Sequence, residues 1–479
     1  MKYLPQPAIL ELGDGFYDEV EPAKFPNLKL RFRNQEWAAR VGLGDLTPEE
    51  WERHFARFEP LPQNLPKPLA LRYHGHQFQS YNPELGDGRG FLFAQFLDPK
   101  EPRRLLDLGT KGSGQTPWSR SGDGRLTLKG AVREVLATEM LEALGVYTSK
   151  TFSVFETGES LQRHDEPSPT RAGVLVRLNH SHIRFGTFQR YAFLQDTGRL
   201  RALLNYSIRH YYPELAEIPD EEKPVAFVRE VSLRAADLCA QWMTAGFVHG
   251  VLNTDNMNIT GESFDYGPYR FLPKYDPEFT AAYFDQTGLY AFGRQSEAVL
   301  WNLEQLATSL LPILDADETP QEPLIEALQM FAPRFNETIV KKLLERLGLS
   351  SRGTESDDQL FIAVFNFFGA SQVSYPQFFH DWYGGRASRD RALKSPEADL
   401  YKGEHFDVML ERFEAYEPTP EASSRLSDDY FKRLKPCSLL IDEIEWIWDA
   451  IAKVDDWSRF EKKVEDIREM GRLYGRRQI

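Results

Sequence analysis

The chain has 479 residues, of which 41% are hydrophobic and 27% charged, a globular composition long enough for two large lobes. Its net charge of −15 argues against a general nucleic-acid binder, which needs a basic face for the phosphate backbone. Two cysteines cannot form a disulfide framework, the N-terminus lacks a signal-peptide pattern, and no apolar run reaches the roughly 18 residues of a membrane span. We expect a cytoplasmic protein, a monomer, without nucleic-acid or membrane partners.

Residues 1–70 are rich in proline and aromatic residues and predict an irregular N-terminal arm. Within it, residues 48–57 have a helical pattern that Thr47 can cap. We expect residues 71–195 to form an N-terminal lobe of mixed structure and residues 196–479 to form a mostly helical C-terminal lobe.

Two glycine-rich segments mark the N-terminal lobe. Residues 85–90 read Leu-Gly-Asp-Gly-Arg-Gly, and residues 122–125 read Gly-Asp-Gly-Arg. Closely spaced glycines let backbone N–H groups approach an anion, and an arginine adds a forked donor for phosphate. A hairpin turn explains the first segment about as well. The nearby His74 and His76 are more readily packing residues than metal ligands.

A lysine and a glutamate follow in an order that protein kinases share. Residues 105–108 predict a strand that leads to Lys111, and the apolar spacing over 128–144 predicts a helix that Gly145 ends. Glu134 lies in the first half of that helix. In kinases such a glutamate holds the strand lysine against the phosphates; the alternative is a solvated lysine and a solvated glutamate.

Of two further arginines, Arg177 lies within a predicted strand and Arg184 follows it. The alternation of Val174, Val176 and Leu178 places Arg177 on the polar face of that strand, toward a cleft. Guanidinium groups suit bidentate phosphate contacts, and these two with Lys111 would neutralise a triphosphate. The alternative is that both arginines pair with surface carboxylates.

The central segment, residues 249–268, follows a predicted helix over 225–245 and reads HGVLNTDNMNITGESFDYGP. Asn256 and Asp265 offer the oxygen ligands that suit Mg²⁺ with a nucleotide. Aminoglycoside-phosphotransferase-like kinases write the loop as H-G-D-L-x-x-x-N, which places Val251 where the catalytic Asp would stand. Valine cannot accept a proton, so Asp255 is the carboxylate at hand. Beyond this segment we expect helices over 295–311, 322–347 and 358–368, and packing roles for Trp446 and Trp448.

These motifs resemble those of the selenoprotein O (YdiU-type) pseudokinases, which are protein nucleotidyltransferases. The resemblance rests on Gly75-His76-Gln77-Phe78, residues 85–89, residues 111–117, residues 119–125, Arg133-Glu134, residues 181–186, residues 249–257 and residues 265–268. It implies an α+β, bilobal protein-kinase-like fold. It also implies that ATP binds in a flipped orientation, so that AMP passes to a Ser, Thr or Tyr hydroxyl of a protein substrate.

The resemblance also implies roles for individual residues. The nucleotide would be held by Gly86, Gly88, Arg89, Lys111, Asp123, Gly124, Arg177, Arg184 and Asp265, with Glu134 orienting Lys111. Asn256 and Asp265 would bind Mg²⁺ or Mn²⁺, and Asp255 would accept the proton. Three alternatives stay open: UMP transfer from UTP with Mn²⁺, a true kinase that uses Asp255 as a displaced base, and a nucleotide-binding scaffold. Many family members carry a C-terminal cysteine that this sequence lacks, so we do not carry over redox control. The region from Ser438 onward differs from the family's usual C-terminal pattern, so we do not carry over substrate docking there.

Overall fold

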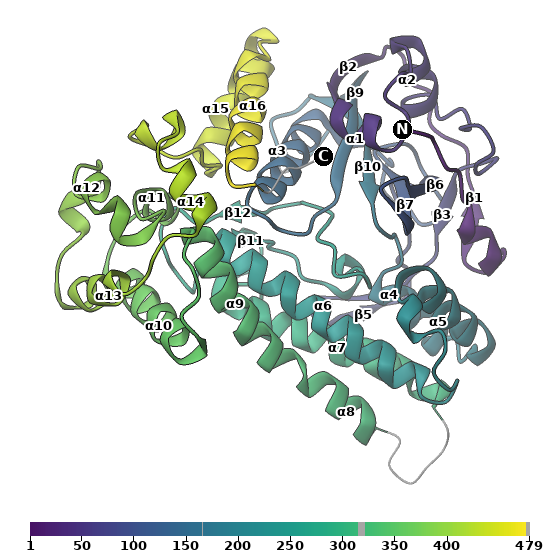
Figure 1. Ribbon diagram of the computed structural model, residues 1–479. Coiled ribbons are helices and arrows are strands. Elements are labelled where there is room, and N and C mark those ends of the chain that lie inside the picture. The colour runs from purple at the N-terminus through teal and green to yellow at the C-terminus, as the bar shows by residue number, and fades with distance from the viewer. Residues whose placement is uncertain (165, 315–320, 476–479) are drawn as a thin grey trace.

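The computed structural model describes residues 1–164, 166–314 and 321–475, which form two lobes (Figure 1). The N-terminal lobe is built on an eight-stranded antiparallel sheet with the order β1-β3-β6-β7-β10-β9-β2, in which β8 also pairs with β10. The strands are β1 (Tyr17–Glu19), β2 (Lys29–Arg33), β3 (Leu69–Leu71), β6 (Leu92–Asp98), β7 (Glu101–Lys111), β8 (Leu126–Thr127), β9 (Lys150–Leu161) and β10 (Thr170–Asn179).

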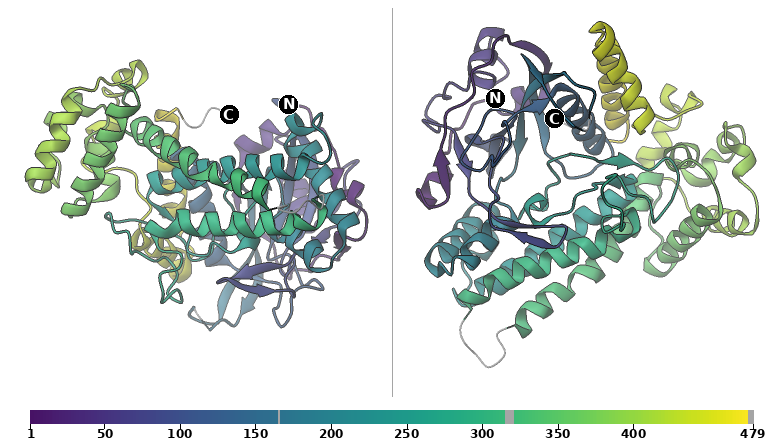
Figure 2. Two further views of the ribbon diagram at one scale, coloured as in Figure 1. Left: turned by 90° about the horizontal axis from the view of Figure 1, so that it is seen from below. Right: turned by 180° about the vertical axis from the view of Figure 1, so that it is seen from behind.

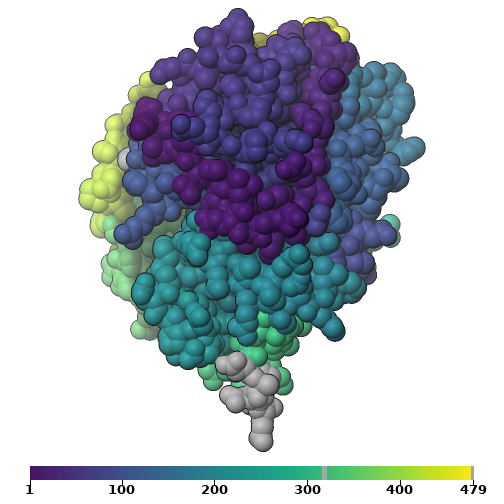
Figure 3. Space-filling view, turned by 90° about the vertical axis from the view of Figure 1, so that its right-hand side faces the viewer, coloured from purple at the N-terminus to yellow at the C-terminus, as the bar shows by residue number. Residues whose placement is uncertain are grey.

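Residues 1–70 are less irregular than the sequence predicts. They supply both edge strands of the sheet, β1 and β2, together with α1 (Gln35–Arg40) and α2 (Pro48–Phe55). The Thr47 hydroxyl accepts a hydrogen bond from Glu50 N and the Glu50 carboxylate accepts one from Thr47 N, so the predicted cap is confirmed as a full capping box. In Figure 3 this purple N-terminal segment covers the upper lobe above the teal helices.

Both faces of the sheet are buried. Val174 and Val176 of β10 pack in a core with Trp51 of α2, whereas Leu175 points into the other core, which α3 (Leu128–Ala143) covers. Alternate residues of a strand lie on opposite faces, so Arg177 is on the side of Leu175 and α3. The face that the sequence predicts as polar is therefore largely a second core, and Arg177 itself is 4% exposed.

Helix α3 begins and ends as predicted and is held from outside by the C-terminal helices. The Thr127 side chain accepts from Gly130 N at its start, and Gly145 takes a φ of 79° beyond its end. Helix α16 (Ser458–Leu473), which follows α15 (Ile441–Val454), lies along α3 (Figure 1). Of the two tryptophans expected to pack in this region, Trp448 is partly buried against the core, but Trp446 is 56% exposed.

The C-terminal lobe is helical. Its first part contains α4 (Phe185–Phe193), α5 (Thr197–Tyr211), α6 (Lys223–Ala245), α7 (Gln295–Leu310), α8 (Glu322–Gln329) and α9 (Phe331–Leu347), and α6 packs against α7, α8 and α9. A separate core joins α10 (Thr354–Ala370), α11 (Tyr375–Asp381), α12 (Arg389–Ala392) and α13 (Glu404–Glu414), which project to one side in Figures 1 and 2. Ala422 of α14 (Pro420–Arg425) is buried in the main core instead. The single helix expected over 322–347 is two helices, because the chain turns at Met330.

Short elements connect these parts. The two-stranded ribbons are β4 (Gly75–Gln77) with β5 (Ser80–Asn82), and β11 (Phe247–Val248) with β12 (Arg270–Phe271). Single 3₁₀ turns are η1 (Ala8–Leu12), η2 (Pro213–Leu215), η3 (Thr254–Asn256), η4 (Phe292–Arg294), η5 (Leu311–Ile313), η6 (Gly385–Ser388), η7 (Ala398–Leu400) and η8 (Asp429–Lys432). In the part of the chain that the structure describes, every helix is too short or too polar to cross a bilayer. The predicted α+β fold, with a mixed N-terminal lobe and a helical C-terminal lobe, is confirmed.

Candidate active site

The ribbon of β11 and β12 presents the central segment between the lobes. Residues 249–269 connect its two strands, and η3 lies at the tip of the loop. His249 fixes the base of this loop, since its backbone N donates to Gln295 Oε1 (3.0 Å) and its Nε2 lies 3.2 Å from Phe264 O. Burial lowers the pKa of His249, so the ring is a neutral structural link at pH 7.

A cavity of about 650 Å³ lies between the glycine-rich segments and this loop. It gathers most of the predicted site: its lining includes Gly86, Gly88, Arg89, Lys111, Asp123, Gly124, Arg177, Arg184, Asp255 and Asp265. Two predicted residues do not line it. Glu134 lies behind Lys111, and Asn256 lies beside Asp255 with its amide nitrogen donating to Val251 O (3.0 Å).

Lys111 joins the two lobes. Its Nζ lies 2.6 Å from Glu134 Oε2 on α3 and 2.7 Å from Asp265 Oδ1 on the C-terminal loop. The Lys111 and Glu134 side chains are 5% and 1% exposed, so neither is a solvated surface group. A buried ammonium held between two carboxylates is fixed in position, which suits contact with a phosphate.

Asp265 is surrounded by cations. Arg177 Nη1 lies 3.5 Å from its Oδ1, and Arg184 Nη1 lies 3.7 Å from its Oδ2. Burial alone would raise the pKa of Asp265, but Lys111, Arg177 and Arg184 hold it well below the usual range. The residue also has a φ of 64°, which is uncommon outside glycine and aims its carboxylate inward.

The two arginines have donor capacity to spare. Both guanidinium groups lie over the Phe264 ring, at 5.2 Å for Arg177 and 4.8 Å for Arg184. Within the described residues, Arg177 Nε and Nη1 and Arg184 Nε are buried without a hydrogen-bond partner. Buried guanidinium nitrogens are rarely left unpaired, so this side of the cavity is prepared for an anion.

Asp255 is the carboxylate that remains unengaged. It is 8% exposed, and its Oδ1 has no hydrogen-bond partner among the residues described. Burial raises its pKa to about 6, although Arg184 opposes the shift. Arg184 Nη1 also donates to the Asp255 backbone oxygen at 2.6 Å. A carboxyl with a pKa near neutrality and a free oxygen is suited to accept a proton.

Both glycine-rich segments pack against residues 114–119. A Cβ on Gly86 would lie 2.4 Å from the Trp118 ring, and the Ser119 hydroxyl donates to Gly88 O. Gly124 has a φ of 69°, and a Cβ there would lie 2.2 Å from the Gly114 backbone. These glycines are therefore required for the close approach of two loops, in addition to any approach to phosphate.

Asp87 and Arg163 are among the lining residues of this cavity that sequence reasoning did not assign to the site. Asp87 Oδ1 lies 3.4 Å from Arg184 Nη2 while its Oδ2 accepts from Leu71 N, so Asp87 links Arg184 to the sheet. Arg163 pairs with Asp123 at 2.9 Å on the cavity rim. Asp87 stands inside the first glycine-rich segment and could have been inferred. Arg163 lies in a polar stretch after β9 and carries no local signal.

The histidines near the site are structural. His74 Nδ1 lies 2.7 Å from Tyr81 Oη and its Nε2 lies 2.8 Å from Arg190 Nη1, while His76 Nδ1 lies 2.7 Å from Gln189 Nε2. Across the described ranges, no group of three or more His, Cys, Asp or Glu side chains is placed to hold a metal. A cation here would rely on one carboxylate, one amide and non-protein oxygens, as Mg²⁺ sites with nucleotides do.

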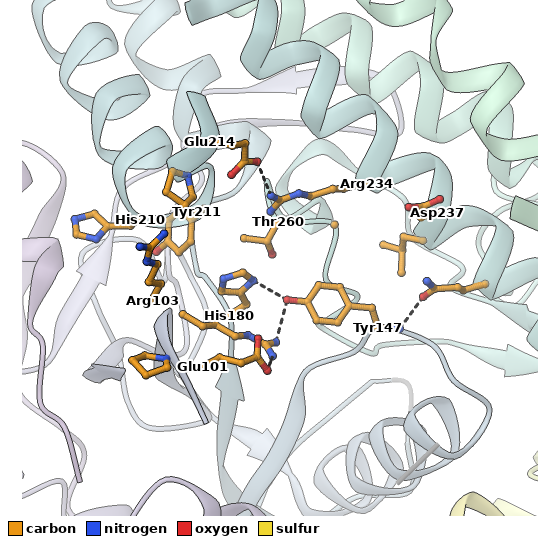
Figure 4. A pocket seen from close by; sticks show the side chains of 16 residues that line it. Glu101, Arg103, Tyr147, His180, His210, Tyr211, Glu214, Arg234, Asp237 and Thr260 are labelled. Carbon is orange, nitrogen blue, oxygen red and sulfur yellow. Dashed lines mark hydrogen bonds and ion pairs between the residues drawn. The ribbon is translucent and has the colours of Figure 1, made fainter. Parts of the chain in front are cut away.

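A second cavity, of about 830 Å³, is larger but contains none of the predicted site residues. It lies where the start of β7 meets α5 and α6 (Figure 4). In it the Tyr147 hydroxyl lies 2.6 Å from His180 Nδ1 and accepts from Arg104 (3.1 Å). The concentration of buried charge therefore favours the smaller cavity as the active site.

A bilobal α+β fold whose cleft holds a fixed lysine, two buried arginines and an isolated aspartate defines a nucleotide-dependent transferase. The family model described as "Protein adenylyltransferase SelO" matches residues 1–468. Proteins named "Protein nucleotidyltransferase YdiU" are 43% identical in Synechocystis sp. (96% of this chain and 97% of the relative) and 43% identical in Gloeobacter violaceus (95% and 93%). A relative of the same name in Vibrio cholerae is 36% identical (77% and 73%). The chain belongs to the SelO/YdiU family of protein nucleotidyltransferases, and it is an enzyme of that class.

Proposed function

We propose that the protein transfers AMP from ATP to Ser, Thr or Tyr hydroxyls of proteins. The observation that carries this proposal is the combination of a valine at position 251 and an aspartate at position 255. The position of the kinase base is apolar, while a buried aspartate with an unpartnered oxygen and a pKa of about 6 lines the cavity four residues later. The base has thus moved, which supports a nucleotide bound in a different orientation from that of a kinase.

In this proposal the cations of the cavity hold the phosphates. Lys111, oriented by Glu134, and the unpartnered nitrogens of Arg177 and Arg184 take the β and γ phosphates. Gly86, Gly88, Arg89, Asp123 and Gly124 close the cavity over the nucleotide. The acceptor oxygen attacks the α phosphorus, pyrophosphate leaves, and the hydroxyl proton passes to Asp255. The acceleration comes from positioning and charge stabilisation.

Asn256 and Asp265 would hold the divalent cation, Mg²⁺ or Mn²⁺. The Asn256 amide nitrogen is engaged by Val251 O, which leaves the amide oxygen for a cation, and Asp265 stays ionised at every relevant pH. When bound, the cation neutralises phosphate charge. Asn256 does not line the cavity, so it would act from the edge of the site.

The mass added to a protein substrate tests this proposal. Purified protein is incubated with a mixed protein extract, Mg²⁺ or Mn²⁺, and ATP or UTP, and modified peptides are read by mass spectrometry. We expect adenylyl groups on hydroxyl side chains with ATP. Uridylyl groups only with UTP and Mn²⁺ would favour the UMP alternative. Phosphoryl groups would identify a kinase with a displaced base, and unmodified peptides would identify a scaffold.

A further inference from the structure

An exposed aromatic patch lies beside the catalytic loop. It consists of Phe78, Tyr283 and Phe284, which are 36%, 80% and 46% exposed. The Phe78 and Phe284 ring centroids are 5.9 Å apart, and those of Tyr283 and Phe284 are 5.1 Å apart. Single exposed apolar residues are ordinary on a protein surface, but adjoining aromatic rings next to an active site mark an interaction site.

The patch is linked to the loop of residues 249–269 through Asn253, and the Thr254 hydroxyl adds a hydrogen bond from His76 N (2.7 Å). Asn253 Oδ1 accepts from Phe78 N (3.1 Å) and from the hydroxyl of Tyr290 (2.8 Å), whose ring lies 5.0 Å from that of Phe78. Asn253 is two residues from Asp255. The hairpin of β4 and β5, seen against the C-terminal helices in the rear view of Figure 2, therefore contacts η3, the turn that carries Asp255.

The hairpin also reaches the mouth of the cavity. Gln77 lines the cavity, and a Cβ on Gly75 would lie 3.1 Å from Asp255 Oδ1. At the hairpin tip, Phe78 and Gln79 have φ values of 49° and 62°. A two-residue turn of this kind favours Asn-Gly, and a bulky residue with positive φ costs stability. An exposed phenylalanine in that position is thus better explained by contact with a partner than by folding.

The charges around the patch are acidic. The solvent-accessible acidic residues of these segments are Asp276 and Glu278 in residues 275–290 and Glu84 in the hairpin residues 75–84, and neither segment contains Lys or Arg; Asp285 is buried and accepts from Leu289 N and Tyr290 N. A partner segment with basic residues would complement this surface, whereas an acidic segment would be repelled.

We propose that this aromatic patch docks the acceptor segment of the protein substrate. The segment carries an aromatic or large aliphatic side chain within a few residues of the modified hydroxyl, with Lys or Arg flanking it. This inference rests on the proposed function, and it adds the substrate class. The apolar side chain packs on Phe284 and Phe78, so that the neighbouring hydroxyl reaches past Gln77 to Asp255.

The test compares three peptides that share a central serine. The first has phenylalanine two residues away and lysines at both ends; the second has alanine for phenylalanine, and the third has glutamates for the lysines. Label transfer from α-labelled ATP is measured with wild type, Phe284→Ser and Tyr283→Ser. The control is Ile362→Ser, which removes a 56% exposed apolar side chain from α10.

We expect wild type to have a KM for the first peptide lower by about tenfold than for either other peptide, as burial of one aromatic side chain allows. Phe284→Ser and Tyr283→Ser should remove the preference for phenylalanine while ATP affinity stays unchanged, and Ile362→Ser should keep that preference. The inference is overturned if wild type labels extract proteins but shows no preference among the peptides, or labels none of them. It is equally overturned if the patch variants keep the preference. Failure of wild type to label any protein would instead overturn the proposed function.

Discussion

Arg184 Nη1 donates a hydrogen bond of 2.6 Å to the backbone oxygen of Asp255. The arginine is the N-cap of α4 and also contacts Asp87 and Asp265. One guanidinium therefore connects the glycine-rich segment, the residue proposed for metal binding and the proposed base. Phosphate binding at Arg184, as proposed above, would be coupled to the position of Asp255 through this contact.

Arg184→Lys tests that connection. A lysine keeps the charge but cannot bridge three groups with a planar fork. Since a hydrogen bond to a charged group contributes about 1.5 to 3 kcal/mol, we expect kcat/KM to fall roughly tenfold to a hundredfold. Steady-state kinetics with ATP measure this. Unchanged kcat/KM in Arg184→Lys would contradict the role of the planar guanidinium group. The control is Arg190→Lys, which changes a neighbouring arginine that does not line the cavity.

Asp255 should determine the acid limb of the pH–rate profile. With its pKa raised to about 6, the carboxyl is protonated below that pH and cannot accept a proton, so kcat should rise with pH through about 6 and then level off. Asp265, whose pKa is held well below the usual range, contributes no limb in this window. Residual activity of Asp255→Asn should be low and lack the limb. A limb that persists in this variant assigns the proton to another group.

The same carboxyl should reduce stability at neutral pH. Its pKa is about 6 when folded against 3.8 in the unfolded chain, so the folded state binds the proton more tightly and loses stability as pH rises from 3.8 through 6. Asp255→Asn should therefore be more stable than wild type at pH 8, by about 1 to 3 kcal/mol, with the difference shrinking toward pH 4. Urea unfolding at the two pH values measures this, and a variant less stable at pH 8 would be incompatible with an unpaired buried carboxylate.

Glu134→Gln should impair Lys111 without unfolding the lobe. The ammonium keeps Asp265 at 2.7 Å but loses its link to α3, so it is drawn toward the C-terminal loop. We expect KM for ATP to rise about tenfold, the effect of losing one charged hydrogen bond. The matched control is Glu445→Gln, which breaks the exposed ion pair between Glu445 of α15 and Lys129, a residue of the same helix α3 that carries Glu134. This control should leave the kinetics unchanged. Equal kinetics for the two variants would argue against the orienting role.

Arg468→Ala should loosen α16 from α3. Its guanidinium makes two hydrogen bonds, of 2.9 and 2.8 Å, to Glu139, whose side chain is 2% exposed. We expect the free energy of unfolding to fall by roughly 1 to 3 kcal/mol. Arg472→Ala, one turn along α16 in an exposed pair with Glu465, should cost less than about 1 kcal/mol. Chemical denaturation separates the two, and equal losses would place the contribution in the helix itself.

Much of this arrangement could be predicted because it depends on local patterns. The apolar spacing of α3, the Thr47 cap and the lysine at the end of β7 are written in neighbouring residues. The contribution of residues 1–70 to the sheet could not be seen, because β2 pairs with β9 more than a hundred residues away. The docking of α16 on α3 involves the pair of Glu139 and Arg468, which are 329 residues apart.

The candidate site also has features that local sequence patterns predict and features that depend on distant residues. Asn256 and Asp265 stand out in one short segment, and all eleven predicted residues that lie in or behind the cavity are glycines, cations or carboxylates. The burial that raises the pKa of Asp255 depends on the whole fold, so a sequence pattern cannot give it. Arg163 reaches Asp123 only because the chain after β9 folds back over the rim.

The central claim is that the α phosphorus, and not the γ, is transferred. The direct measurement is incubation of the protein with a protein mixture and Mg²⁺ or Mn²⁺, using ATP labelled on either the α or the γ phosphate. We predict protein-bound label from the α position alone, lost in Asp265→Ala and strongly reduced in Asp255→Ala while ATP binding by the latter persists. Protein-bound label from the γ position alone would contradict the account. It would identify the protein as a kinase that uses Asp255 as its base, since Val251 occupies the position of the usual catalytic aspartate.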